Sequence, residues 1–290
     1  MDGELRIGIS GWRYAPWRGV FYPRKLPHKR ELEYASRRLP TIEINGSFYS
    51  LQTPQSYAAW RDATPDDFVF AVKAPQYITH RRRLKEVDTA LANFLASGLF
   101  ELQHKLGPVL WQFPPQMPYL HERFETFFAQ LPRDTEAASK IAAKHTLAPE
   151  RASVGIDRRR ALRHAVEIRH PSFADPAFIA LLRRYRVALV VADTAGKWPL
   201  LEDLTSDFVY LRLHGDRELY VSGYDDAALE RWAKRIRAWR AGKQVADAHR
   251  ASPRDGRART RRDVYVYFDN DVKVRAPFDA ETLMRKLAAA

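Results

Sequence analysis

Pairs of polar side chains, spaced two residues apart, end apolar stretches at several points in the chain. In each pair the polar residues alternate with aliphatic ones. Because side chains alternate across a β-strand, both members of a pair would point to one side. The pairs are Glu43 with Asn45, Glu167 with Arg169, and Arg212 with His214. Carboxylates and imidazoles transfer protons and guanidinium groups bind anions, so the pattern indicates acid–base chemistry beside an anion-binding group.

The catalytic candidates are Glu43, Glu167 and His214. Two carboxylates that face each other across a pocket can divide the roles of acid and base if their environments separate their pKa values. A histidine at a strand end can act as a general acid or base, donate to a phosphate or bind a metal ion. For Glu167 a structural interpretation also stays open, because buried charges are usually paired and Arg169 lies two residues away.

Positive side chains near these carboxylates favour a small anionic ligand such as a phosphate or carboxylate compound, because arginine forks bind such oxygens in pairs. Lys73 ends another apolar stretch and could add charge or form a Schiff base, or it could pair with Glu43. Trp12 and Tyr49 could stack a sugar or a nucleobase, or could pack to close the fold. The expected ligand-binding residues are Trp12, Asn45, Tyr49, Lys73, His80, Gln112, Arg169, His170, Asp193, Arg212 and Asn270.

A divalent metal ion is an alternative that the same residue types allow. Suitable nitrogen and oxygen ligands are His170, His214, Glu43, Glu167 and Asp193. However, neighbouring arginines repel a cation, and the chain has no short local motif such as H-E-x-x-H. We therefore predict no cofactor and no metal site.

The elements that must position these residues are eight short apolar runs separated by helical stretches. The runs are 5–9, 41–45, 68–73, 108–112, 164–169, 187–193, 208–214 and 264–270. The helical stretches are 27–38, 53–60, 88–106, 120–131, 175–185, 225–239 and 280–287. This alternation predicts a parallel α/β fold, a (β/α)8 TIM barrel, with its active site at the carboxyl ends of the strands. An antiparallel sheet with one wet face would show the same polar alternation but would not require the helices.

Length and composition limit the classes of protein. The chain of 290 residues suits one barrel domain over 1–290, and no Gly/Ser/Pro-rich linker divides it. We expect a cytoplasmic protein without a membrane partner, because no leader precedes the first strand and no apolar run could cross a bilayer. The absence of cysteine excludes disulfides, thiolate catalysis and cysteine-ligated metals. The sequence makes no prediction of the oligomeric state.

Much of the net charge of +13 lies in two connections. Residues 240–262 hold eight basic residues against two aspartates, and 151–163 hold five arginines against one aspartate. The segment 241–262 is expected to be a mobile surface loop. It could hold nucleic acid through phosphates. Alternatively it reflects a general arginine bias, because 36 of the 48 basic residues are arginine.

Seven strings occur in an order that resembles the DUF72 family, also called YecE-like proteins. They are GISGW at 8–12, EINGSFY at 43–49, KAP with TH at 73–80, QFPP at 112–115, AVEIRH at 165–170, RLHG at 212–215 and YFDND at 267–271. The resemblance implies a TIM barrel with a polar pocket and no established reaction. This chain departs from it at Asp269, where an asparagine is usual, at Phe173, where a tryptophan is common, and in the length of 241–262.

Our leading hypothesis is an acid–base enzyme (a hydrolase, lyase or isomerase) that acts on a small anionic or sugar-phosphate-like compound at the barrel mouth. The alternative is a protein that binds or processes nucleic acid through the basic loops and the rim. It rests on fold analogy, because barrels of this kind are similar in outline to endonuclease IV and sugar isomerases, and fold does not determine function.

Overall fold

A computed structural model describes residues 2–288, in which eight parallel strands form a closed barrel. Each strand pairs with the next along the chain, and β8 pairs with β1. The strands are β1 (Leu5–Ser10), β2 (Thr41–Ile44), β3 (Val69–Lys73), β4 (Leu106–Gln112), β5 (His164–Glu167), β6 (Ala188–Asp193), β7 (Phe208–Leu213) and β8 (Asp263–Phe268). The predicted (β/α)8 barrel is confirmed, and all eight predicted runs contain strands.

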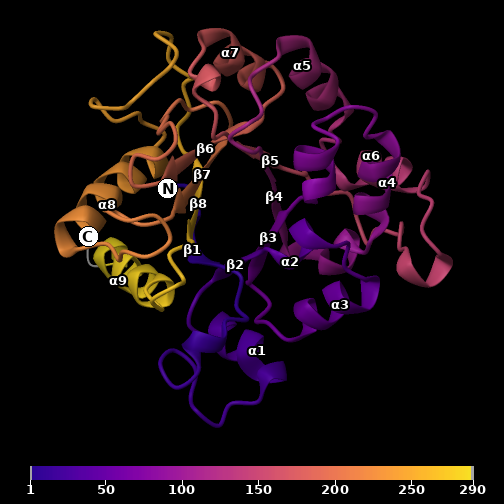
Figure 1. Cartoon of the computed structure of the whole chain (residues 1–290), viewed down its shortest axis with the longest axis horizontal. Helices are drawn as coiled ribbons and strands as arrows, with labels where there is room; N and C mark the ends of the chain where they lie inside the picture. The colour runs from indigo at the N-terminus through magenta and orange to yellow at the C-terminus, as the bar shows by residue number, and fades with distance from the viewer. Residues whose placement is uncertain (1, 289–290) are drawn as a thin grey trace.

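Helices surround the barrel on its outer side (Figure 1). They are α1 (Glu31–Ser36), α2 (Gly46–Tyr49), α3 (Pro54–Asp62), α4 (Asp88–Ala96), α5 (His121–Gln130), α6 (Thr135–Ala142), α7 (Pro176–Arg184), α8 (Asp226–Arg240) and α9 (Ala276–Ala288). The connection between β6 and β7 carries no helix. No helix in residues 2–288 has the length and apolar character needed to cross a membrane.

Local sequence explains where three of the helices begin. Thr53 accepts a hydrogen bond from the backbone of Ser56, and a proline follows it in the first turn of α3. Asp175 caps α7 in the same way, with a proline next, and Asp225 caps α8. A short polar side chain at the cap satisfies a free backbone amide, and proline has no amide to leave free.

The continuous helix predicted over 88–106 is wrong, because Gly98 interrupts it. The backbone of Gly98 has φ +113°, and a Cβ there would lie 2.5 Å from Cα of Pro54. Only glycine fits both the left-handed conformation and this close approach. Helix α4 therefore ends at Ala96, and a 3-10 segment over Leu99–Lys105 leads into β4.

Alternation along the strands divides the barrel into an interior and an outer core. Ile42 and Ile44 pack with the helices in the outer core, as the sequence pattern predicts. The interior is filled with side chains from alternate positions, including the buried rings of Tyr210 and Tyr267, whose centroids are 5.0 Å apart. Above these rings, toward the carboxyl ends of the strands, the interior becomes polar.

The two basic connections lead into the amino ends of β5 and β8, at the opposite end of the barrel from its mouth. Residues 241–262 contain no helix or strand, as predicted. Two buried acids hold the first half of this segment. Asp203 accepts hydrogen bonds from the backbone of Ala251 and Ser252, and Glu202 accepts one from His249. These bonds connect residues 249–252 to the chain before β7.

Candidate functional site

A cluster of buried charges lies across the barrel interior at the level where the strands end. The guanidinium group of Arg212 on β7 is fully buried. It donates to Glu43 at 2.8 Å, to Glu167 at 2.6 Å and to Asp269 at 2.9 Å. His214 lies in the same layer, with Nδ1 3.0 Å from a carboxylate oxygen of Asp269. We call Glu43, Glu167, Arg212, His214 and Asp269 the buried ion cluster.

The cluster keeps two of its carboxylates, Glu167 and Asp269, ionised. Burial alone would raise the pKa of Glu167, but Arg212 and Arg169 outweigh it and hold that pKa well below the ordinary value. Burial also acts to raise the pKa of Asp269, and Arg212 and His214 together lower it strongly. Carboxylates with such low pKa values do not donate a proton near neutral pH and bind one only weakly.

Glu43 and Arg212 have no free side-chain surface for a ligand. Besides Arg212, the carboxylate of Glu43 accepts hydrogen bonds from Ser10 at 2.9 Å and Tyr210 at 2.6 Å. The buried positions of these side chains do not fit the predicted contact of Arg212 with an anion. They also do not fit the predicted acid–base roles of Glu43 and Glu167. Those groups instead form a fixed layer beneath the mouth. The ion pair of Glu167 with Arg169, which the sequence left open, is present at 2.8 Å.

A polar cavity of about 450 Å³ opens above the cluster, and we call it the mouth cavity. It brings together six of the predicted ligand-binding residues: Asn45, Tyr49, Lys73, His80, Gln112 and Arg169. Its other lining residues are Tyr14, Phe48, Gln76, Tyr220, Asp269 and Asp271. All of them follow or end a strand, so the cavity lies where the barrel fold predicts a site.

Arg169 is the cation of the mouth cavity whose side chain has the most positioning contacts. Its guanidinium carbon lies 3.9 Å from the centroid of the Trp198 ring. Its Nε donates to Glu167 at 2.8 Å, and Nη2 donates to the hydroxyl of Tyr220 at 3.2 Å. Stacking and hydrogen bonding fix the plane of a guanidinium group. The remaining part of the Arg169 guanidinium therefore faces the cavity in a defined direction.

Lys73 and His80 line the cavity with lowered pKa values. Burial and the charge of Arg212 lower the pKa of Lys73 to about 8, and its Nζ lies 4.3 Å from the centroid of the Phe48 ring. Burial and the charge of Lys73 lower the pKa of His80 to about 4. His80 is therefore neutral at pH 7, with its ring nitrogens 2.8 Å from the Thr79 hydroxyl and 3.3 Å from the Gln112 amide.

Asp271 is the acid of the mouth cavity whose pKa lies nearest to neutrality. Burial and the negative charge of Asp269 raise its pKa to about 6. The two aspartates thus have opposite properties although they are two residues apart. Asp269 remains ionised against Arg212, whereas Asp271 gains and loses a proton near physiological pH. Two carboxyls with separated pKa values are an arrangement that recurs in acid–base catalysis.

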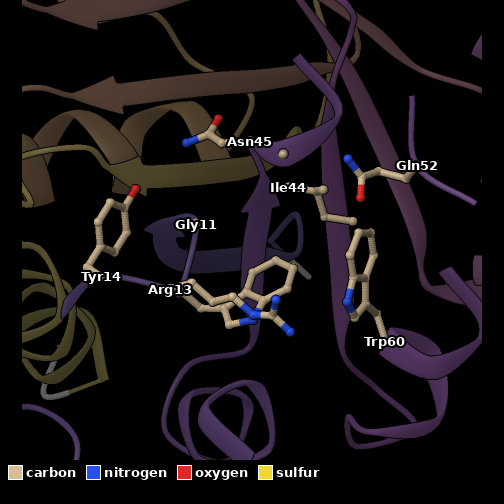
Figure 2. Close-up of a pocket in the computed structure, with 9 residues that line it drawn as sticks. Gly11, Arg13, Tyr14, Ile44, Asn45, Gln52 and Trp60 are labelled. Atoms are coloured by element: carbon tan, nitrogen blue, oxygen red, sulfur yellow. The ribbon is translucent and has the colours of Figure 1, made fainter. Parts of the chain in front are cut away.

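A second hollow of about 270 Å³ adjoins the mouth cavity and shares Tyr14 and Asn45 with it. Figure 2 shows these two side chains on one side and Gln52 and Trp60 on the other. The predicted residue Trp12 lines this hollow rather than the mouth cavity, with its ring edge-to-face against Trp60 at 5.3 Å. Trp12 is thus close to the site but largely engaged in packing.

Three predicted residues point away from the cavity, because along the chain they alternate with the residues whose side chains point inward. Asn270 donates to Asp279, Asp193 accepts from Tyr224, and His170 caps a short helix through the backbone of Ser172. The alternation that begins with Tyr265 and Tyr267 instead brings Asp269 and Asp271 inward, and that signal was present in the sequence. Tyr220 comes from a loop and had no periodic signal.

The five residues whose types suit a metal ion do not all converge. His170 and Asp193 lie outside the interior, whereas His214, Glu43 and Glu167 lie within the buried ion cluster. In residues 2–288 no three histidine, aspartate or glutamate side chains are arranged to hold a metal ion.

Arginines from both basic connections meet at the other end of the barrel. They line a hollow of about 550 Å³ beside Asp207 and Asp263, and we call this surface the arginine face: Arg163, Arg257, Arg259, Arg261 and Arg262. Because it lies at the amino ends of the strands, it does not form one continuous surface with the rim of the mouth. The basic loops and the rim of the predicted nucleic-acid surface thus lie at opposite ends of the barrel.

Comparison with known sequences gives family relationships without an activity. The family model described as "Protein of unknown function DUF72" matches residues 6–290. The UPF0759 protein YunF of Bacillus subtilis (strain 168) is 33% identical over 116 residues, which cover 38% of this chain and 40% of YunF. The UPF0759 protein YecE of Escherichia coli (strain K12) is 29% identical over 129 residues, 39% of this chain and 44% of YecE. The matched part thus spans less than half of each relative.

Solved structures share the fold over almost the whole chain. A DUF72 family protein from Thermotoga maritima has a TM-score of 0.72 and 22% identity, covering 98% of this chain and 99% of its own. A DUF72 family protein from Enterococcus faecalis has a TM-score of 0.68 and 16% identity, covering 99% and 96%. At these identities the likeness concerns the fold alone.

Proposed function

The chain belongs to the DUF72 family of proteins of unknown function, and we propose that it is an acid–base enzyme whose small anionic substrate binds in the mouth cavity. One observation carries the proposal. A single cavity of about 450 Å³ holds both a fixed arginine, Arg169, and a carboxyl group with a pKa near neutrality, Asp271. A cavity of this size suits a metabolite rather than a polymer.

Arg169 is the proposed anion-binding group. Its contacts with Glu167, Tyr220 and Trp198 orient the guanidinium before a ligand arrives, so little side-chain freedom is lost on binding. The amide of Gln112 and the neutral imidazole of His80 supply further polar contacts without adding charge. A carboxylate or phosphate oxygen fits this combination best.

Asp271 is the proposed proton-transfer group, in place of Glu43 and Glu167. With a pKa of about 6 it is mostly ionised at pH 7 and can accept a proton from a bound substrate. The nearby charge of Asp269 raises that pKa and so makes Asp271 a stronger base. We expect kcat/KM to rise with pH through about 6 for this reason.

Thermal-shift and calorimetric binding measurements with small phosphates and carboxylates test the proposal. We expect a subset of these compounds to bind the wild-type protein, and we expect Arg169→Gln to weaken that binding at least tenfold. The matched control is Arg257→Gln, which removes an arginine from the opposite end of the barrel and should leave binding unchanged. Equal losses in the two variants, or binding by neither class of anion, would contradict the proposal.

A second function, binding of a nucleic acid or another polyanion, is favoured by one feature of the arginine face. Arg257, Arg259 and Arg261 are exposed beside a hollow of about 550 Å³. Arginines spaced along an extended segment can each contact a phosphate. This candidate no longer involves the mouth, so each function can be tested without the other.

A further inference from the structure

We propose that Lys73 is a carbonyl-reactive amine, which forms an imine with a ketone or aldehyde group of the substrate in the mouth cavity. The proposal rests on the proposed function, because it concerns the same site and adds the chemical class of the substrate: a small oxo acid or a carbonyl phosphate. Arg169 would hold the anionic end of such a compound, and Lys73 would meet its carbonyl carbon.

The position of Lys73 suits a nucleophile. It is the last residue of β3, and its backbone carbonyl accepts a hydrogen bond of 2.7 Å from the hydroxyl of Ser47, which fixes the start of the side chain. Its Nζ extends over the ring of Phe48 and lines the cavity. The nearby carboxylates of the buried ion cluster face Arg212 instead of this amine.

A second buried lysine shows what a structural role looks like in this protein. Lys105 donates to the carbonyl of Arg61 at 2.6 Å, and to the carbonyl and hydroxyl of Thr64 at 2.7 and 3.2 Å. Its ammonium group therefore has three acceptors, as a buried charge requires. The contacts of Lys73 are an aromatic ring and a polar cavity, and they leave its amine available to a ligand.

The surroundings also increase the share of unprotonated amine, which is the reactive form. Burial and the charge of Arg212 lower the pKa of Lys73 to about 8. At pH 7 this gives roughly 300-fold more free amine than a lysine with the ordinary pKa of about 10.5. An exposed lysine such as Lys85 lacks this burial.

The reaction balances without an oxidant or a metal ion. The Nζ lone pair attacks the carbonyl carbon, and the electrons of the C=O double bond move to oxygen, which takes up a proton. The attacking nitrogen gives up one proton, which leaves a neutral carbinolamine. The carbinolamine takes up a second proton on its hydroxyl group and loses water as the nitrogen lone pair forms the C=N bond, and the nitrogen then gives up its remaining proton. Asp271 has a suitable pKa to supply and recover these protons. One amine and one carbonyl give one imine and one water.

Trapping with borohydride tests the inference directly. Wild-type protein is incubated with pyruvate, with dihydroxyacetone phosphate or with the neutral probe glycolaldehyde, and is then reduced with sodium cyanoborohydride. We expect a mass increase equal to the probe less one oxygen atom, mapped by peptide analysis to Lys73 at least tenfold ahead of Lys105 and Lys85. In Lys73→Arg, which keeps the charge but cannot form an imine, this label should disappear.

The outcomes separate the two proposals. Binding of an anion that Arg169→Gln weakens, without selective labelling of Lys73 by any of the three probes, would overturn the imine and leave the proposed function standing. Selective labelling by glycolaldehyde, without binding of any anion, would support a reactive amine at Lys73 and contradict the proposed anion site at Arg169. Labelling of Lys85 as fast as Lys73 would overturn the inference regardless of binding.

Discussion

The charged residues at the two ends of the barrel are arranged in opposite ways. Below the mouth, Arg212 is fully buried and is shared by three carboxylates, so that each charge has partners of the other sign. On the arginine face, Arg257, Arg259 and Arg261 are exposed, with two aspartates beside the same hollow. Charges of the first kind determine structure and pKa values, whereas those of the second kind are available for an external partner.

We expect replacement of the buried Arg212 to have the largest effect on stability. Arg212→Met keeps an unbranched apolar stem but leaves Glu43, Glu167 and Asp269 without their shared cation. Breaking a buried ion pair from one side typically costs 3–5 kcal/mol, so we expect the free energy of unfolding to fall by more than about 3 kcal/mol. Urea denaturation measures this change.

The control for this prediction is Arg257→Met, which should alter the free energy of unfolding by less than about 0.5 kcal/mol. Similar losses in the two variants would mean that the buried cluster is no more important for stability than an exposed arginine.

A smaller change in the free energy of unfolding, and of opposite sign, is expected when Asp271 is replaced. Its folded-state pKa of about 6 lies above the unfolded value, so ionisation destabilises the folded protein above pH 6, and the effect vanishes below about pH 4, where both states are protonated. Asp271→Asn should therefore stabilise the protein by about 1–2 kcal/mol at pH 8, with a gain that shrinks as the pH falls through 6. Thermal unfolding between pH 4 and 8 tests this, and a gain independent of pH would refute it.

The smallest effect on stability, and the largest on polyanion binding, is expected from the triple variant Arg257→Gln, Arg259→Gln and Arg261→Gln. Unfolding should change by less than about 0.5 kcal/mol, because these side chains are exposed. Binding to a short DNA or RNA duplex should weaken, with a salt slope that decreases by about 3, one for each lost phosphate contact. A duplex affinity unchanged by the substitutions would remove the second candidate function.

The strands and their inward residues could be predicted from the sequence, but the depth of each side chain could not. Alternation correctly puts Glu43, Glu167 and Arg212 inside the barrel. Whether they reach solvent depends on what covers them, and the cover includes Tyr220, whose ring packs against His214 at 5.3 Å and whose loop has no periodic pattern. Asn270 and Asp193 each follow the alternation of outward-pointing positions, so the strand pattern itself predicts that they face away from the interior.

The rings of Tyr210 and Tyr267 beneath the cluster give the barrel an insulating layer. Both are fully buried, and they stand between the ion cluster and the amino ends of the strands. The barrel interior at this level is therefore a packed core and not a pore. The arginine face and the mouth are separate surfaces at the two ends of one packed barrel.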